Sequence, residues 1–275
     1  MDASSPEFQY LTGQMRDSFA ALFQDFERRN AQALSLPGWT LDLAYGAHPR
    51  EVFDFRPADG PTRGTVVYWH AGYWQTRDKA QFRFLAPGFN ALGWDVALIN
   101  YPLCPEVRVS DIVGSAERAL RAVRAQQAAN GVSPAVVLCG HSAGAQLAVE
   151  VAMRAAASGD CVAGVIPISG VFDLRPLIHT TLNARLQLDA ASAEAASPGL
   201  RSRADVAPAL FVLGATETPA FHDQTQAMAQ AWQAQGNATQ VLAVAGADHF
   251  SVLDGWTDAK GPLARQLAAW AAPAP

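Results

Sequence analysis

The chain has 275 residues, of which 50% are hydrophobic and 16% charged, and its formal net charge is -5 at pH 7. This length and apolar content allow one large domain with a buried core and exclude an intrinsically disordered chain. With 25 Asp and Glu against 20 Lys and Arg, the chain lacks the basic surface that nucleic-acid binding requires. We therefore expect a globular protein that acts on a small-molecule substrate and does not bind nucleic acid.

Cysteine usage and the N-terminal residues bear on the cellular location. The three cysteines, Cys104, Cys139 and Cys161, have neither the density of a disulfide framework nor the paired spacing of a zinc site. The N-terminus has no basic segment leading into an apolar one, so it does not resemble a secretory signal. No apolar run reaches the roughly 18 to 20 residues of a membrane span. The sequence predicts a cytoplasmic protein without membrane contact, and leaves a homodimer open.

The first part of the chain shows two different periodicities. Apolar residues recur at helical spacing from Phe8 to Phe26, which predicts one amphipathic helix over about 7–34. Residues 40–46 and 51–57 then alternate or run apolar with β-favouring side chains around a Gly-Ala-His-Pro turn. This pattern predicts an antiparallel hairpin.

Beyond the hairpin, short apolar runs alternate with helical patterns. The predicted strands are 65–70, 95–101, 135–140, 162–169, 208–214 and 239–245, and the clearest helices are 110–130, 143–158, 219–236 and 262–272. Such alternation implies right-handed crossovers and a mainly parallel sheet with helices on both faces. We predict a single α/β domain over 1–275 with an eight-stranded sheet.

The longest interval after a strand in the middle of the sheet runs over about 171–206. It is rich in Ala, Leu and Ser, which favours short helices. Open α/β sheets bind ligands at the carboxyl edge of their strands. We therefore expect this segment to form a small helical cap over the site.

The sharpest motif is Gly140-His141-Ser142-Ala143-Gly144, between a predicted strand and a predicted helix. A serine on a tight strand-to-helix turn needs small neighbours, because the backbone is strained and the helix must pack closely against the strand. The turn would hold the Ser142 hydroxyl near a helix N-terminus, which favours developing negative charge. We interpret Ser142 as a nucleophile; the alternative is a structural turn with an inert serine.

A nucleophilic serine requires a base, and His249, after the last predicted strand, is the best placed histidine. We interpret the other candidates as polar surface or local structure: His48, His179, His222 and, within the serine motif, His141. Glu217 follows the strand at 208–214 and is our preferred acid to orient His249. Asp173, one strand earlier, is the rival, and its alternative role is a helix N-cap. Two further acids are set aside: Asp223 and Asp248.

The residues after the strand at 65–70 supply candidate amide donors for an oxyanion. We assign this role to the backbone amides of Gly72 and Tyr73, with that of Ala143 as a further donor. The alternative is an aromatic-rich loop packed into the core, and we expect His70 to order this loop instead of transferring protons. The candidate walls of an aromatic substrate pocket are Tyr73, Trp74, Phe172 and Phe250.

Taken together, the motifs HAGYW, DVALINYPLCP, GHSAGAQLA, SGVFDLRPL, GATETPAF and ADHFSVL resemble the α/β-hydrolase family of kynurenine formamidases (arylformamidases) and their esterase-like relatives. The resemblance covers most of the chain. It implies hydrolysis of N-formylkynurenine to kynurenine and formate by a cofactor-free serine mechanism. It carries the nucleophile onto Ser142, the acid onto Glu217, the base onto His249 and the oxyanion loop onto Gly72 and Tyr73.

Two departures from the family pattern bear on the site. Ala71 replaces the first of two paired glycines, and alanine is disfavoured if that position needs a positive φ. The acid is glutamate where many relatives have aspartate. Two other functions stay open: a promiscuous carboxylesterase for short acyl esters, and a non-catalytic binding protein that keeps the fold. No cluster of His, Cys, Asp and Glu has metal-ligand spacing, so we expect no metal or cofactor.

Overall fold

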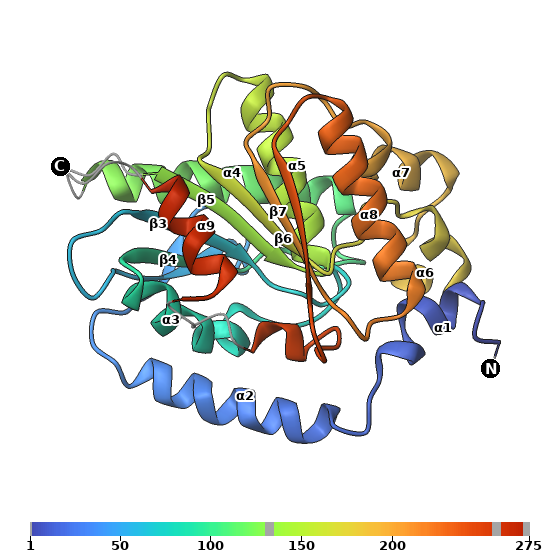
Figure 1. The fold of residues 1–275 in the computed structure, drawn as a ribbon, viewed down its shortest axis with the longest axis horizontal. Helices are drawn as coiled ribbons and strands as arrows, with labels where there is room; N and C mark the ends of the chain where they lie inside the picture. Colours follow the sequence, from blue (N-terminus) through green and yellow to red (C-terminus); the bar gives the residue numbers. More distant parts are fainter. Residues whose placement is uncertain (1, 130–134, 255–259, 272–275) are drawn as a thin grey trace.

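The computed structural model describes residues 2–129, 135–254 and 260–271, and over these residues the chain forms one eight-stranded sheet (Figure 1). The strand order is β1-β2-β4-β3-β5-β6-β7-β8. The strands are β1 (Thr40–Ala44), β2 (Val52–Arg56), β3 (Gly64–Trp69), β4 (Trp94–Ile99), β5 (Ala135–His141), β6 (Gly164–Ile168), β7 (Ala209–Gly214) and β8 (Thr239–Val244). Strands β3 to β8 pair in parallel, whereas β2 pairs antiparallel with both β1 and β4. The α/β fold and its mainly parallel sheet are therefore confirmed.

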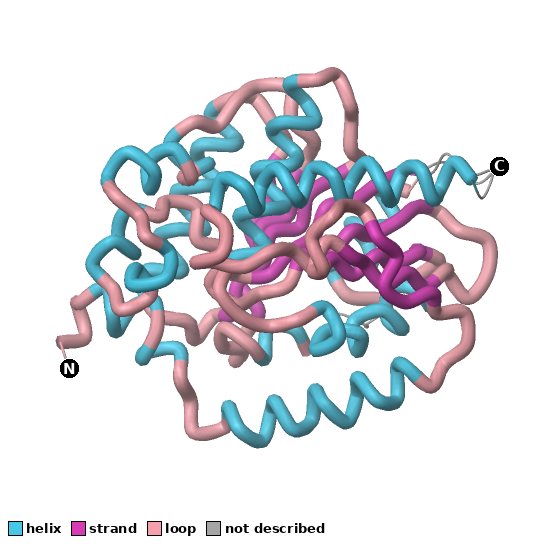
Figure 2. Tube along the Cα trace, turned by 180° about the vertical axis from the view of Figure 1, so that it is seen from behind, coloured by secondary structure: helices cyan, strands magenta, loops and turns pink. Residues whose placement is uncertain are grey.

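Helices cover both faces of the sheet, which lies between them in Figures 1 and 2. One hydrophobic core cluster joins the sheet to α4 (Val109–Ala129), α5 (Ala143–Ala157) and α8 (Pro219–Ala234). The other joins it to α2 (Phe19–Leu34), α3 (Ala86–Ala91), α9 (Pro262–Trp270) and the 3₁₀ helix η2 (Lys79–Leu85). The last residues of two predicted helices, 130 and 272, lie outside the described residues. None of the helices in the described ranges has both the length and the apolar character to span a bilayer.

The central strands are buried on both faces, as their continuous apolar runs predict. Every side chain of β3 and β4 is buried, and Val66 of β3 stands in register with Val96 of β4 and Val137 of β5. β8 lies at the edge of the sheet, and its residues are half-buried or exposed. Buried parallel strands of this kind bring their carboxyl ends to one edge, where ligands bind.

The N-terminal segment differs from the single helix expected over 7–34. It forms α1 (Pro6–Tyr10), a 3₁₀ turn (Thr12–Gln14) and α2. The chain turns at Gly13, where a Cβ would lie 2.7 Å from the Phe8 carbonyl oxygen, and Met15 has an extended backbone. The prediction of one helix was wrong because the helical spacing of apolar residues continues across this turn. As a result, α1 packs against α8 while α2 packs against η2.

The cap segment, residues 171–206, connects β6 to β7. It contains four short helices: η3 (Arg175–His179), α6 (Asn183–Leu186), α7 (Ala190–Ala195) and η4 (Pro198–Leu200). A hydrogen bond from the Leu174 amide to the Ser197 hydroxyl, at 2.8 Å, joins the residues before η3 to the residues between α7 and η4. α1 contacts η3, so the start of the chain meets this segment.

Candidate active site

Ser142 lies on the sharp turn between β5 and α5, with φ 55° and ψ -116°. This left-handed conformation is unfavourable for a residue with a side chain, so the surroundings must impose it. The Ser142 amide donates to the Ile168 carbonyl at the end of β6, at 2.8 Å. A Cβ on Gly140 would lie 2.0 Å from the Gly144 carbonyl oxygen, and one on Gly144 would lie 2.0 Å from the Trp69 carbonyl oxygen. Both glycines are needed because α5 begins in direct contact with β3 and β5.

His249 and Glu217 form a buried hydrogen-bonded pair. His249 Nδ1 lies 2.8 Å from Glu217 Oε2. The other oxygen of Glu217 accepts from the Ser169 hydroxyl at 2.5 Å and from the Gly214 amide at 2.7 Å. Because an ionised carboxylate only accepts hydrogen bonds, Nδ1 carries the proton, and Nε2 is left to accept one.

The other candidate acids, Asp173, Asp248 and Asp223, have different surroundings from Glu217. Asp173 pairs with Arg175 through Oδ2 and Nη2 at 2.7 Å. Asp248 caps the turn that follows it, by accepting the amides of residues 250 and 251. Asp223 is exposed on α8. Glu217 is therefore the acid that contacts His249.

The other histidines occupy different places. His48 pairs with Glu106 beside the β1–β2 turn, His179 is exposed in η3, and His222 is half-buried in α8. These positions agree with the expectation of surface or local roles.

His141 links the serine turn to the segment that carries His249. Its Nε2 lies 2.7 Å from the His249 carbonyl oxygen, and the two rings are 4.8 Å apart. Burial holds the pKa of His141 well below its ordinary value. The neutral ring therefore donates through Nε2, and this bond brings the segments of Ser142 and His249 together.

The loop after β3 carries the predicted oxyanion donors. Gly72, Tyr73 and Trp74 have φ values of 130°, 53° and 58°. A Cβ on Gly72 would lie 2.1 Å from the Thr76 carbonyl oxygen, so only glycine fits there. Ala71 does not have a positive φ. The difficulty foreseen for alanine at position 71 therefore does not arise.

The backbone amides of Gly72, Tyr73 and Ala143, the predicted oxyanion donors, have no protein acceptor among the described residues. Those of Gly72 and Tyr73 make no hydrogen bond in the described ranges. Ala143 is the first residue of α5, and the amides of a first helical turn have no intrahelical acceptor. Their role as oxyanion donors stays a prediction.

Two of the expected pocket residues are completely buried in the core. The Trp74 ring nitrogen donates to Gln146 Oε1 at 3.1 Å, and Phe172 packs edge-on against Phe211 at 5.9 Å. The other two lie at the border of the N-terminal segment. The Tyr73 hydroxyl donates to a backbone carbonyl of α1, at Tyr10, and Phe250 packs between His249 and the first turn of α2. Contact of these four side chains with a substrate stays a prediction.

Sequence reasoning missed Ser169 as a supporting residue. Ser169 directly follows β6, has φ 47° and donates to Glu217. A serine at the end of a buried parallel strand is a signal that could have indicated it, because strand ends meet at one edge of the sheet. In the described part of the chain, no three His, Cys, Asp or Glu side chains gather as metal ligands would.

Comparison with known proteins places this site in a family. Residues 66–253 match the family model described as the alpha/beta hydrolase fold. The chain belongs to the α/β-hydrolase fold family. This hydrolase is 28% identical over 246 residues to a kynurenine formamidase of Danio rerio, with 86% of this chain and 83% of that protein covered. It is 28% identical over 232 residues to a kynurenine formamidase of Drosophila melanogaster, with 79% and 77% covered.

Solved structures agree with this membership. A candidate thioesterase from Silicibacter sp. TM1040 superposes with a TM-score of 0.86 at 31% identity, covering 98% of this hydrolase and 99% of that chain. An esterase from Pyrobaculum calidifontis superposes with a TM-score of 0.73 at 20% identity, covering 91% and 90%, and shares the fold. The resemblance to kynurenine formamidases and esterases that the motifs indicated is confirmed.

Proposed function

We propose that the protein is a serine hydrolase that cleaves a small aryl formamide, with N-formylkynurenine as its substrate. The observation that carries the proposal is the buried His249–Glu217 pair, tied through His141 to a strained serine turn. The similarity to proteins named kynurenine formamidase over most of the chain supports the choice of substrate.

In this mechanism, Nε2 of His249 takes the proton of the Ser142 hydroxyl as the oxygen attacks the formyl carbon. The tetrahedral oxyanion accepts hydrogen bonds from the amides of Gly72, Tyr73 and Ala143. The imidazolium, stabilised by Glu217, then protonates the aniline nitrogen as the C–N bond breaks. Water attacks the formyl-enzyme along the same path, which releases formate and restores the serine.

A promiscuous carboxylesterase for short acyl esters is the second candidate. It would use the same residues, and the fold shared with the Pyrobaculum calidifontis esterase favours it. Because esters are intrinsically more reactive than amides, detection of esterase activity alone does not separate the two functions.

The test compares kcat/KM for N-formylkynurenine with kcat/KM for p-nitrophenyl acetate, with Ser142→Ala as the blank. We expect a several-fold or greater preference for the formamide and loss of both activities in Ser142→Ala. Preference for the ester with negligible formamide turnover would support the carboxylesterase instead. Retained activity in Ser142→Ala would refute the serine mechanism, and failure of a fluorophosphonate to label Ser142 would point to a non-catalytic protein.

A further inference from the structure

The loop from His70 to Asp78 has an unfavourable backbone conformation over much of its length. Besides Gly72, three residues with side chains have positive φ: Tyr73, Trp74 and Arg77. Such residues cost free energy in the left-handed region and persist only where the surrounding structure imposes it. What holds this loop therefore determines where its amides point.

Within the loop, three donors converge on the Gly72 carbonyl oxygen. These are the amides of Gln75 and Thr76, at 2.9 and 3.0 Å, and the Thr76 hydroxyl at 3.1 Å. In a planar trans peptide, the carbonyl and the following N–H point in opposite directions. Holding the Gly72 carbonyl inward therefore directs the Tyr73 N–H outward, as an oxyanion donor requires.

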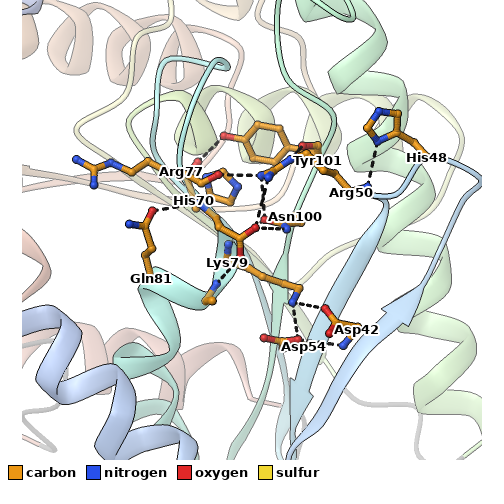
Figure 3. A network of polar contacts seen from close by, with 12 residues as sticks. Asp42, His48, Arg50, Asp54, His70, Arg77, Lys79, Gln81, Asn100 and Tyr101 are labelled. Atoms are coloured by element: carbon orange, nitrogen blue, oxygen red, sulfur yellow. Dashed lines mark hydrogen bonds and ion pairs between the residues drawn. The ribbon is translucent and has the colours of Figure 1, made fainter.

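The two ends of the loop are held by a polar cluster that converges on Arg50 (Figure 3). Arg50 extends from the turn between β1 and β2. Its guanidinium donates to four acceptors: the Arg77 carbonyl at 2.8 Å, the Tyr101 carbonyl at 2.9 Å, Asn100 Oδ1 at 3.2 Å and Asp78 Oδ2 at 3.3 Å. It thus joins the far end of the loop to the residues that follow β4.

Tyr101 extends this hold to the start of the loop. Its hydroxyl donates to the His70 carbonyl at 2.7 Å, and its ring stacks on the His70 ring at 4.3 Å. Asn100 closes the cluster, because its Nδ2 donates to Asp78 Oδ2 at 2.7 Å and its Oδ1 accepts from the Lys79 amide at 2.8 Å.

The charges in the cluster favour this arrangement. Burial opposes ionisation of Asp78, but hydrogen bonds from the Ala80 amide and Asn100, with the charge of Arg50, hold the pKa of Asp78 below its usual range. The carboxylate therefore remains charged against Arg50. A guanidinium meets several acceptors with one rigid planar fork, whereas a lysine ammonium is a single charge on a flexible stem.

We propose that Arg50 is a positioning residue for hydrolysis: by holding the far end of the loop directly and its start through Tyr101, it fixes the amides of Gly72 and Tyr73 against the tetrahedral oxyanion. The inference rests on the proposed function, since it requires Ser142 as the nucleophile. The hydrogen bonds of Arg50 go to the far end of the loop and to the two residues that follow β4, so it acts through the loop.

The experiment uses the full chain with Arg50→Met and Arg50→Lys, and with Arg121→Met, an exposed arginine of α4, as the matched control. We would measure kcat and KM for p-nitrophenyl acetate, the Kd of an aryl trifluoromethyl ketone, and Tm. The ketone forms a serine adduct whose oxyanion occupies the same place as that of the reaction. Displacement of catalytic groups by about 1 Å can lower rates by about 100-fold.

For Arg50→Met we expect kcat to fall about 10- to 100-fold with KM within threefold of the wild type. The affinity for the ketone should fall by the same factor as kcat/KM, and Arg50→Lys should recover part of both. Arg121→Met should match the wild type. Tyr101→Phe removes only the bond to the His70 carbonyl, and it should lower both kcat and the affinity for the ketone to a smaller extent. It replaces Arg50→Met in this test if Arg50→Met does not fold.

A folded Arg50→Met with kcat/KM within twofold of the wild type would overturn the inference. So would a loss of kcat without a matching loss of affinity for the ketone, since general destabilisation does not act selectively on the oxyanion. Ser142→Ala distinguishes failure of the role of Arg50 from failure of the proposed function. If Ser142→Ala is inactive and Arg50→Met fully active, only the role of Arg50 fails; if Ser142→Ala remains active, the proposed function fails and the inference with it.

Discussion

Glu217 makes three hydrogen bonds in a buried position, to His249, Ser169 and the Gly214 amide. Glu217→Gln keeps the shape but replaces one accepting oxygen with an NH₂ group, which must face a donor on one side or the other. We expect kcat/KM to fall by about 10³- to 10⁴-fold, because the histidine loses its orientation and the stabilisation of its cation. Steady-state kinetics on the folded variant measures this loss.

The matched control for that substitution is Asp173→Asn. Asp173 pairs with Arg175 and not with His249, so we expect its kcat/KM to stay within threefold of the wild type. Equal losses in the two variants would contradict the assignment of Glu217 as the acid.

His70 gives a second prediction at the residue scale, in the pH dependence of stability. Burial lowers the pKa of His70 from 6.5 to about 4. Between these values the unfolded chain binds a proton that the folded protein does not. The free energy of unfolding is therefore highest above pH 6.5 and falls as the pH drops toward 4, by about 1.4 kcal/mol per pH unit from this one group.

Urea unfolding at pH 5, 6 and 7 measures this slope, and His70→Gln removes the titrating group. We expect the slope of the variant to be smaller by about one proton. The buried His141, whose pKa is also lowered by burial, should keep the remaining slope positive. An unchanged slope in His70→Gln would show that this ring is not held neutral by the fold.

At the scale of elements, close contact between α5 and β3 builds the serine turn. A Cβ on Gly144 would lie 2.0 Å from the Trp69 carbonyl oxygen, so Gly144→Ala must push the helix away from the strand. We expect the free energy of unfolding to fall by about 3 kcal/mol, the upper range for overpacking. Gly114, inside α4, is the control, because its nearest neighbour to a new Cβ is 3.7 Å away.

Gly114→Ala should raise the free energy of unfolding by about 0.5 to 1 kcal/mol, since alanine restricts the unfolded chain and favours helix. Urea denaturation of both variants provides the comparison. Similar changes in the two would mean that α5 does not pack against β3 as described.

Elements buried on both faces could be predicted from the sequence, whereas elements shaped by local turns could not. The runs 95–101 and 135–140 correspond to β4 and β5 within two residues, because a strand covered by helices needs apolar side chains at every position. The segment of η2 and α3 was not predicted, since Pro87 interrupts its helical spacing. Strand order was also beyond reach, because periodicity does not encode which strands pair.

Within the site, too, some residues could be predicted from the sequence and others could not. Serine, acid and histidine each follow a strand, so their sequence positions already indicate a common edge of the sheet. The cluster around Arg50 gives no such signal. It joins residues from three separated segments of the chain through backbone carbonyls, which every residue has.

At the scale of the whole molecule, hydrogen bonds join the start of the chain to the cap segment. Ser142 is 2% and His249 1% exposed. Glu7 of α1 accepts hydrogen bonds from the amide and the hydroxyl of Thr181 in the cap segment, at 2.8 and 2.7 Å, and Figure 1 shows α1 beside α6. The Tyr73 hydroxyl binds the same N-terminal segment at Tyr10. Because Ser142 and His249 are buried, we expect α1 and the cap segment to restrict the entry of a substrate.

Restricted entry of this kind predicts selection by substrate size, and Glu7→Ala tests it by removing the two bonds from α1 to the cap segment. In the wild type we expect kcat/KM to fall steeply from p-nitrophenyl acetate to p-nitrophenyl octanoate. In Glu7→Ala the octanoate-to-acetate ratio should rise several-fold, while activity on acetate stays within twofold, because the catalytic residues are untouched. Glu27→Ala, an exposed glutamate of α2, should leave the ratio unchanged. The same ratio in Glu7→Ala as in the wild type would mean that the contact between α1 and the cap segment does not limit entry.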